Sequence, residues 1–214
     1  MGPTAIAGQT YTGAEYGQYN LWSNALSGGE SMIYIPGIEQ LCKDRETWQH
    51  ICDLAENKQV DSPLLLEFQS NSASAGRWDA VYAISLLAGL ETSVLIDADD
   101  VVFIDWGTSG RVPLKPPIGS RMPFKTWVHT HPGFAAYWSA TDTNSLAIGS
   151  GILRQAIVLG SPGPKVAINL AFNKNYDAPN TINTSGPLSS WSDEPVTPWD
   201  EWYQQIEDSR GVIV

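Results

Sequence analysis

The chain has 214 residues and a formal net charge of −11, because 12 Lys and Arg side chains face 23 Asp and Glu side chains. This acidic balance excludes a nucleic-acid-binding surface, which needs clustered basic side chains. A hydrophobic content of 43% supplies one sizeable core, so we expect one domain with extensions. The only three histidines are His50, His129 and His131, and two of them lie two positions apart.

Neither a secretory signal nor a membrane span is expected. The first thirty residues lack the basic and apolar regions of a signal peptide. The longest uncharged apolar stretch, residues 80–90, is shorter than the about 20 residues that cross a bilayer. Cys42 and Cys52 would lie roughly 15 Å apart on a continuous helix, which is too far for a disulfide. Unpaired cysteines favour a reducing interior, so we expect a soluble, cytoplasmic protein.

Residues 1–43 are interpreted as an N-terminal extension, of which residues 1–30 are rich in Gly, Ser, Thr and Asn without a clear period. Residues 44–57 predict an amphipathic helix, because apolar side chains recur at spacings of three and four. These side chains are Trp48, Ile51, Cys52 and Ala55.

Two further segments precede the first expected strand. The short apolar run 64–68 is compatible with either a strand or a helical turn. A stretch rich in Ser, Ala and Gly at 70–76 then leads to a helix at 78–88, which Gly89 terminates.

From residue 91 onward the apolar pattern changes to a period of two, which predicts strands. The expected strands are 91–97, 101–106, 124–131, 155–160 and 166–172. The first two strands form a hairpin, and a Pro-rich segment at 113–123 then runs over the surface. Pro132 ends the third strand, and a helix at 141–153 follows. This order of elements predicts a mixed α/β fold with a central β-sheet flanked by helices.

The most informative segment is His129-Thr130-His131-Pro132, followed by Ser139 and Asp142. Residues i and i+2 of a strand point to the same face, so the two imidazoles converge. A loop after Pro132 can return Asp142 from the first turn of the next helix, where Ser139 and Asp142 also fit a capping box. Two imidazoles and one carboxylate with an open fourth position match a catalytic Zn²⁺ site.

This segment resembles the JAMM (JAB/MPN) family of zinc metalloproteases. The family signature is His-x-His-Pro, six residues, then Ser-x-x-Asp, and His129, His131, Pro132, Ser139 and Asp142 meet it without a gap. The stretch HTHPGFAAYWSATDTN is similar to the proteasome-lid deubiquitinase of that family. The resemblance covers residues 78–172 and implies an MPN/JAMM, cytidine-deaminase-like fold for a catalytic domain at 44–175. Residues 176–214 form an acidic C-terminal extension rich in Pro, Ser and Trp.

The resemblance also assigns roles to residues outside the metal ligands. It implies an upstream Glu as general base, for which Glu91 at the head of a strand is preferred and Glu67 is the alternative. It implies that the Ser139 hydroxyl stabilises the oxyanion, and we expect Trp138 and Phe134 to contact the substrate.

By resemblance, the reaction is zinc-dependent cleavage after the C-terminal tail of ubiquitin or a ubiquitin-like modifier, which is then the expected partner. Two alternatives stay open. One is a metallohydrolase of the same type that acts on another peptide or amide. The other is a non-catalytic MPN scaffold, a class that usually lacks the ligands present here.

Overall fold

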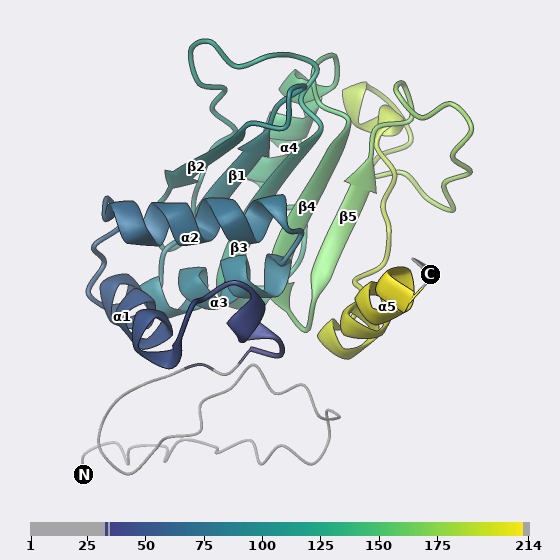
Figure 1. Ribbon diagram of the computed structural model, residues 1–214. Coiled ribbons are helices and arrows are strands. Elements are labelled where there is room, and N and C mark those ends of the chain that lie inside the picture. The colour runs from purple at the N-terminus through teal and green to yellow at the C-terminus, as the bar shows by residue number, and fades with distance from the viewer. Residues whose placement is uncertain (1–32, 34, 212–214) are drawn as a thin grey trace, which may run out of the picture.

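The computed structural model describes residue 33 and residues 35–211, so the arm expected at 1–30 lies outside the described residues. The described chain contains a five-stranded sheet with helices on both faces (Figure 1). None of its helices combines the length and apolar character that a bilayer span requires.

The strands are arranged in the order β2-β1-β3-β4-β5. Their bounds are β1 Thr92–Ile96, β2 Val102–Trp106, β3 Thr126–Ala135, β4 Gln155–Ser161 and β5 Pro164–Ile168. Only β3 and β4 pair in parallel, whereas the other neighbours are antiparallel. A parallel pair needs a crossover connection, and helix α4 (Ala140–Gly149) supplies it. The expected mixed α/β class with a central sheet is therefore confirmed.

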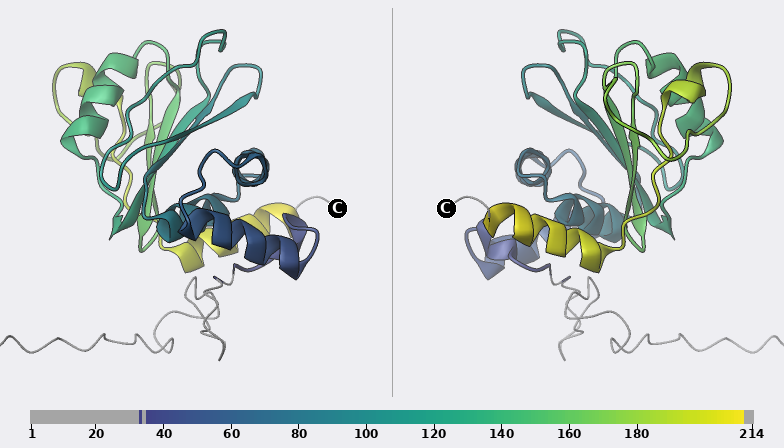
Figure 2. Two further views of the ribbon diagram at one scale, coloured as in Figure 1. Left: turned by 90° about the vertical axis from the view of Figure 1, so that its left-hand side faces the viewer. Right: turned by 90° about the vertical axis from the view of Figure 1, so that its right-hand side faces the viewer.

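The helices form layers on the two faces of the sheet. One face is covered by α1 (Arg45–Glu56), α2 (Pro63–Ser74) and α3 (Trp78–Ala88), with α5 (Trp199–Gly211) beside α3. The other face carries α4 and the short 3-10 helix η2 (Pro187–Ser190), as the side views show (Figure 2). A second 3-10 helix, η1 (Ile38–Gln40), precedes α1.

Alternation along the strands divides the apolar core into two clusters, one on each face of the sheet. Val94 and Val128 point into the cluster under α1, α2 and α3. Leu95 and Trp127 point into the cluster under α4. His129 and His131 follow Trp127 at a spacing of two, so both imidazoles lie on the α4 side of the sheet.

Several sequence expectations are confirmed closely. Helix α3 spans Trp78–Ala88 and ends at Gly89, whose φ of 60° is the left-handed conformation that glycine adopts without strain. Strands β1 and β2 form the expected hairpin. Both cysteines are free and buried. The ambiguous run at 64–68 is helical, and α2 continues through Ser74 because Gln69, Ser72 and Ala73 are buried by tertiary packing.

The expectation that Pro132 ends the third strand is wrong. Strand β3 continues to Ala135, but its pairing with β4 shifts register between Thr130 and Ala135. Proline has no N–H for the ladder and is tolerated at such an irregularity. The strand therefore carries the chain past the two histidines and up to the loop that leads into α4.

Two expected C-terminal bounds are also corrected. The helix expected at 141–153 is α4, which ends at Gly149, and Gly151 follows, since glycine disfavours continuation of a helix. The strand expected at 166–172 is β5, which ends at Ile168. There the Asn169 side chain donates hydrogen bonds to the Ser150 and Leu153 carbonyls and turns the chain.

A buried ion pair at the start of α3 joins distant parts of the chain. Arg77 Nη2 lies 2.7 Å from Asp79 Oδ2, and the two side chains are 4% and 0% exposed. The same guanidinium donates to the Pro36 and Gly37 carbonyls. The Tyr203 hydroxyl of α5 donates to Asp79 Oδ2 at 2.8 Å. The network thus connects the segment before α1 and helix α5 to the N-terminus of α3.

Candidate metal centre

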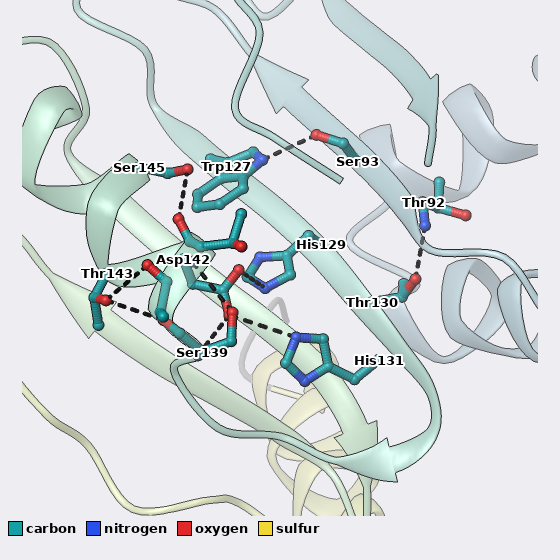
Figure 3. Close-up of polar contacts among 12 residues, drawn as sticks. Thr92, Ser93, Trp127, His129, Thr130, His131, Ser139, Asp142, Thr143 and Ser145 are labelled. Atoms are coloured by element: carbon teal, nitrogen blue, oxygen red, sulfur yellow. Dashed lines mark hydrogen bonds and ion pairs between the residues drawn. The ribbon is translucent and has the colours of Figure 1, made fainter. Parts of the chain in front are cut away.

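Three potential metal ligands meet where β3 faces the first turn of α4 (Figure 3). His129 and His131 come from one face of β3, and Asp142 comes from α4. All three residues are buried, and their ligand atoms lie within 4.8 Å of one another. This group could hold a metal ion.

The Asp142 carboxylate lies between the two imidazoles. Its Oδ1 is 3.0 Å from His129 Nε2, and its Oδ2 is 3.5 Å from His131 Nε2. The contact between His129 Nε2 and Asp142 Oδ1 is short but lacks the alignment of a hydrogen bond. Both nitrogens of the fully buried His129 ring therefore have no hydrogen-bond partner in the described residues. Buried polar atoms are normally satisfied, so an unpartnered nitrogen aimed at a carboxylate fits a site for a cation.

Neighbouring groups fix the orientation of both rings. His131 Nδ1 lies 3.2 Å from the Ala135 carbonyl oxygen, which can only accept, so Nδ1 carries the proton and leaves the Nε2 lone pair for a ligand bond. The Trp127 indole stacks on His129 with ring centroids 4.5 Å apart. Trp127 Nε1 in turn donates to Ser93 Oγ at 2.9 Å. The imidazoles are therefore held by packing and by hydrogen bonds on the sheet.

The capping box of α4 holds the third ligand. The Ser139 N–H donates to Asp142 Oδ2 at 2.7 Å, and the Asp142 N–H donates to Ser139 Oγ at 3.3 Å. Burial favours the neutral form of Asp142, but the His129 and His131 imidazoles and the Ser139 hydrogen bond outweigh it and hold the pKa of Asp142 well below its usual range. The carboxylate is therefore ionised and ready to bind a cation.

The two imidazoles differ electrostatically. Burial lowers the pKa of His129, so this ring is neutral at neutral pH, as a ligand must be. Burial also disfavours protonated His131, but the hydrogen bond and charge of Asp142 outweigh it and raise the pKa of His131. Protonated His131 has a proton on Nε2, which faces Asp142. A cation bound between His131 and Asp142 would replace this proton.

Glu91 lies in the same pocket as His131, Ser139 and Asp142. Glu91 directly precedes β1, and two backbone hydrogen bonds fix its position. Its N–H donates to the Thr108 carbonyl and its carbonyl accepts from the Gly107 N–H, each at 2.8 Å. Burial raises the pKa of Glu91 to about 7. A carboxyl group with such a pKa can exchange protons near neutral pH.

Glu67, the alternative base, lies elsewhere. It is exposed on α2, which covers the opposite face of the sheet, and it does not line the pocket. Of the two glutamates that the sequence offered, the fold brings only Glu91 to the histidines.

The pocket has a volume of about 200 Å³. Phe134 and Tyr137 form part of its wall and are 62% and 52% exposed. Trp138, expected to contact the substrate, does not line it and packs against the apolar cluster under α4. Its neighbour Tyr137 takes the pocket position, with its ring centroid 4.9 Å from that of His131.

Sequence reasoning did not identify the opposite wall of the pocket. Residues 109–112 after β2 form it, and Thr141 also lines the pocket. The Gly-Thr-Ser-Gly turn at 107–110 was a visible signal of a loop at this point. Only the pairing of β1 with both β2 and β3 brings this loop beside the histidines.

Gly160 on β4 supports the segment that orients His131. A Cβ at this position would lie 2.5 Å from the Ala136 nitrogen and 2.8 Å from the Ala135 carbonyl carbon. We expect Gly160→Ala to displace the Ala135 carbonyl and to weaken the binding of a metal ion about 10- to 100-fold, measured by competition with a chromogenic chelator.

Gly151→Ala is the matched control, because no atom lies within 4 Å of the added Cβ. It should leave the affinity unchanged. Equal affinities for the two variants would show that the Ala135 carbonyl does not govern the site.

Comparison of the chain with protein-family models, curated proteins and solved structures gives no match. The class of the site follows from its own geometry, which is a buried His-His-Asp group on a mixed α/β sheet, next to a glutamate and a capping serine.

Proposed function

We propose that this chain is a zinc-dependent peptidase of the JAMM type, with the MPN/JAMM, cytidine-deaminase-like fold. Its substrate is a peptide or isopeptide bond after the C-terminal tail of ubiquitin or a ubiquitin-like modifier. One observation carries the proposal: His131 and Asp142 of the buried His129-His131-Asp142 group line one pocket together with Glu91 and Ser139. The two free cysteines fit a reducing compartment, and we place the protein in the cytoplasm on that ground.

Zinc is the metal that the donor set supports best. Two imidazole nitrogens and one carboxylate oxygen are ligands that Zn²⁺ accepts, and three protein ligands leave a position for water or substrate, as in catalytic sites. When bound, Zn²⁺ supplies a Lewis acid that acidifies water and polarises a carbonyl group. His129, His131 and Asp142 would hold it.

Glu91 acts as the proton carrier. Its carboxylate takes a proton from the attacking water and delivers it to the nitrogen of the leaving amine. Its raised pKa of about 7, caused by burial, suits both transfers, since the group must be deprotonated first and protonated afterwards. Its place in the pocket beside His131 and Asp142 puts this carboxyl group next to the reacting bond.

Ser139 stabilises negative charge on the carbonyl oxygen of the cleaved bond. Ser139 lines the pocket, and its hydroxyl oxygen caps α4. A hydroxyl can accept the cap hydrogen bond and donate its own proton at the same time. The same side chain therefore positions Asp142 and contributes a donor for the oxyanion.

Removal of the Ser139 hydroxyl should separate these two roles. We expect Ser139→Ala to lower kcat by about 10²–10³-fold through loss of an oxyanion donor. It should also destabilise the protein by about 1 kcal/mol through loss of the helix cap. Ser139→Gly is the matched variant, because glycine at an N-cap costs only a few tenths of a kcal/mol.

The two variants should therefore show the same loss of kcat but different thermal stability. A kcat that follows stability instead would assign Ser139 to the cap alone.

The volume of the pocket supports a narrow substrate. A volume of about 200 Å³ is below the roughly 300–1,000 Å³ of small-molecule sites, so it admits a narrow chain of small residues rather than a bulky ligand. The exposed Phe134 and Tyr137 rings can contact such a chain as it enters.

The test is hydrolysis by the purified full-length chain with Zn²⁺ bound. We expect about one Zn²⁺ per chain and cleavage of a ubiquitin-like fusion in preference to a short peptide without the modifier. Cleavage of the short peptide alone would identify a metallohydrolase for another peptide or amide. Zn²⁺ binding without any hydrolysis would identify a scaffold, and absence of Zn²⁺ binding would contradict the proposal as a whole.

A further inference from the structure

Arg111 is the one permanently charged cation among the residues that line the pocket. It is exposed and belongs to the loop after β2, and it lines the same pocket as Phe134 and Tyr137. The other charged residues of the pocket are Glu91 and Asp142. The guanidinium therefore shares the pocket with two carboxyl groups and the imidazole of His131.

The Arg111 side chain has no ion pair or hydrogen bond with any described residue, although the protein has an excess of carboxylates. Four other cations pair with carboxylates: Arg77 with Asp79, Arg121 with Asp99, Lys125 with Asp100 and Lys165 with Asp193. Lys115, like Arg111, is exposed and has no ion pair among the described residues, but it does not line the pocket. A guanidinium offers five donors in a planar fork. At Arg111 this capacity is left for a ligand that enters the pocket.

The backbone of Arg111 is fixed relative to the candidate base. Its carbonyl accepts from the Thr108 N–H at 2.9 Å, and the Thr108 carbonyl accepts from the Glu91 N–H at 2.8 Å. Gly107 permits this close loop, because a Cβ there would overlap the Arg111 carbonyl oxygen. The base of the arginine side chain is thus held at a defined place beside Glu91.

We propose that Arg111 is a specificity-determining residue that binds a carboxylate of the substrate, within about two residues of the cleaved bond. The inference rests on the proposed peptidase function. Arg111 lines the same pocket as Glu91, His131 and Asp142, and a residue of an extended chain spans at most about 3.6 Å, so a group bound by Arg111 within this pocket lies close to the reacting bond. The planar fork matches a carboxylate in a bidentate manner.

The carboxylate has two possible sources, an acidic side chain and a free C-terminus. Both offer the same planar, singly charged group to the guanidinium. Hydrogen bonds with charged partners contribute enough for a preference of about 10- to 100-fold over the neutral amide.

The test measures binding apart from hydrolysis. Zn²⁺-loaded, full-length Glu91→Gln protein is titrated with fluorescein-labelled octapeptides of Gly and Ala, each with Glu or Gln at one scanned position. A second pair carries a free or an amidated C-terminus. We expect about 10- to 100-fold tighter binding of the acidic member in one or two of these pairs, and loss of the difference when Arg111→Gln is added. The side-chain and C-terminal arms identify the source of the carboxylate.

Two further variants sharpen the test. Lys115→Gln removes the same charge from an exposed residue outside the pocket lining, so it should keep the preference. Arg111→Lys keeps the charge but not the fork, so it should retain only part of it. Equal binding of all acidic and neutral pairs, no binding of any peptide, or a preference that survives Arg111→Gln would overturn the inference.

Hydrolysis of a ubiquitin-like fusion by the wild-type chain is scored separately. Arg111-dependent binding of the peptides without hydrolysis of the fusion would contradict the proposed peptidase and leave the carboxylate site standing. Hydrolysis of the fusion without any preference for the acidic peptides would support the proposed peptidase and contradict the carboxylate site.

Discussion

Glu91→Gln is expected to lower kcat/KM by about 10²–10⁴-fold while one Zn²⁺ stays bound. Glutamine has the shape of glutamate but cannot take the proton from water, and Glu91 is not among the three ligands of the metal group. The measurement is steady-state hydrolysis of a ubiquitin-like fusion together with metal analysis of the same sample.

Glu67→Gln is the matched control, because that side chain is exposed on α2 away from the pocket. It should retain full activity. Full activity of Glu91→Gln with loss in Glu67→Gln would exchange the two assignments.

The pH dependence of the wild-type enzyme should report the same carboxyl group. Burial raises the pKa of Glu91 to about 7, so the base becomes protonated and kcat/KM falls as the pH decreases through this region. A bound cation favours the carboxylate and moves the midpoint to lower pH. The residual activity of Glu91→Gln should lack this acidic limb, and an unchanged limb would assign it to another group.

Asp142→Asn is expected to abolish hydrolysis and to weaken Zn²⁺ binding by more than about 100-fold. The amide keeps an oxygen that can accept the Ser139 hydrogen bond, but it loses the negative charge that lies between His129 and His131. The effect should exceed the roughly 10- to 100-fold loss typical of groups that only orient a ligand.

Thermal unfolding with and without a chelator provides a second measurement of the same variant. Free Zn²⁺ at 100 times its Kd stabilises a protein by about 2.7 kcal/mol, which corresponds to about 5–10 °C in Tm for a chain of this size. The chelator should lower the Tm of the wild type and of the exposed control Asp177→Asn by this amount. It should leave that of Asp142→Asn nearly unchanged, and an equal shift in all three would place the metal elsewhere.

The convergence of the candidate metal ligands could be predicted because their geometry is local. The i, i+2 spacing of His129 and His131 fixes a common face on any strand, and the Ser139-x-x-Asp142 pattern fixes a helix start. The hairpin and helix α3 follow equally local signals of alternation and a terminal glycine. Both kinds of signal depend on a few neighbouring residues, so tertiary packing did not change them.

The relative positions of residues from different strands and faces of the sheet could not be deduced from such local signals. The choice between Glu91 and Glu67 depends on which face of the sheet each segment reaches. The continuation of β3 past Pro132 depends on its irregular pairing with β4, and the choice of Tyr137 over Trp138 depends on the loop that follows. The position of Arg111 requires the strand order β2-β1-β3, which a linear pattern does not contain.

The Arg77–Asp79 network has a consequence for the smallest part of the chain that can fold alone. A fragment trimmed to residues 44–175 would remove the Pro36 and Gly37 carbonyls and the Tyr203 hydroxyl, and would leave a buried charged pair short of partners. Each lost partner costs about 1–3 kcal/mol, a large share of the roughly 5–15 kcal/mol by which a domain is stable. We therefore expect a stable fragment to extend at least from Pro36 to Tyr203, because both flanks form hydrogen bonds with the ion pair at the start of α3.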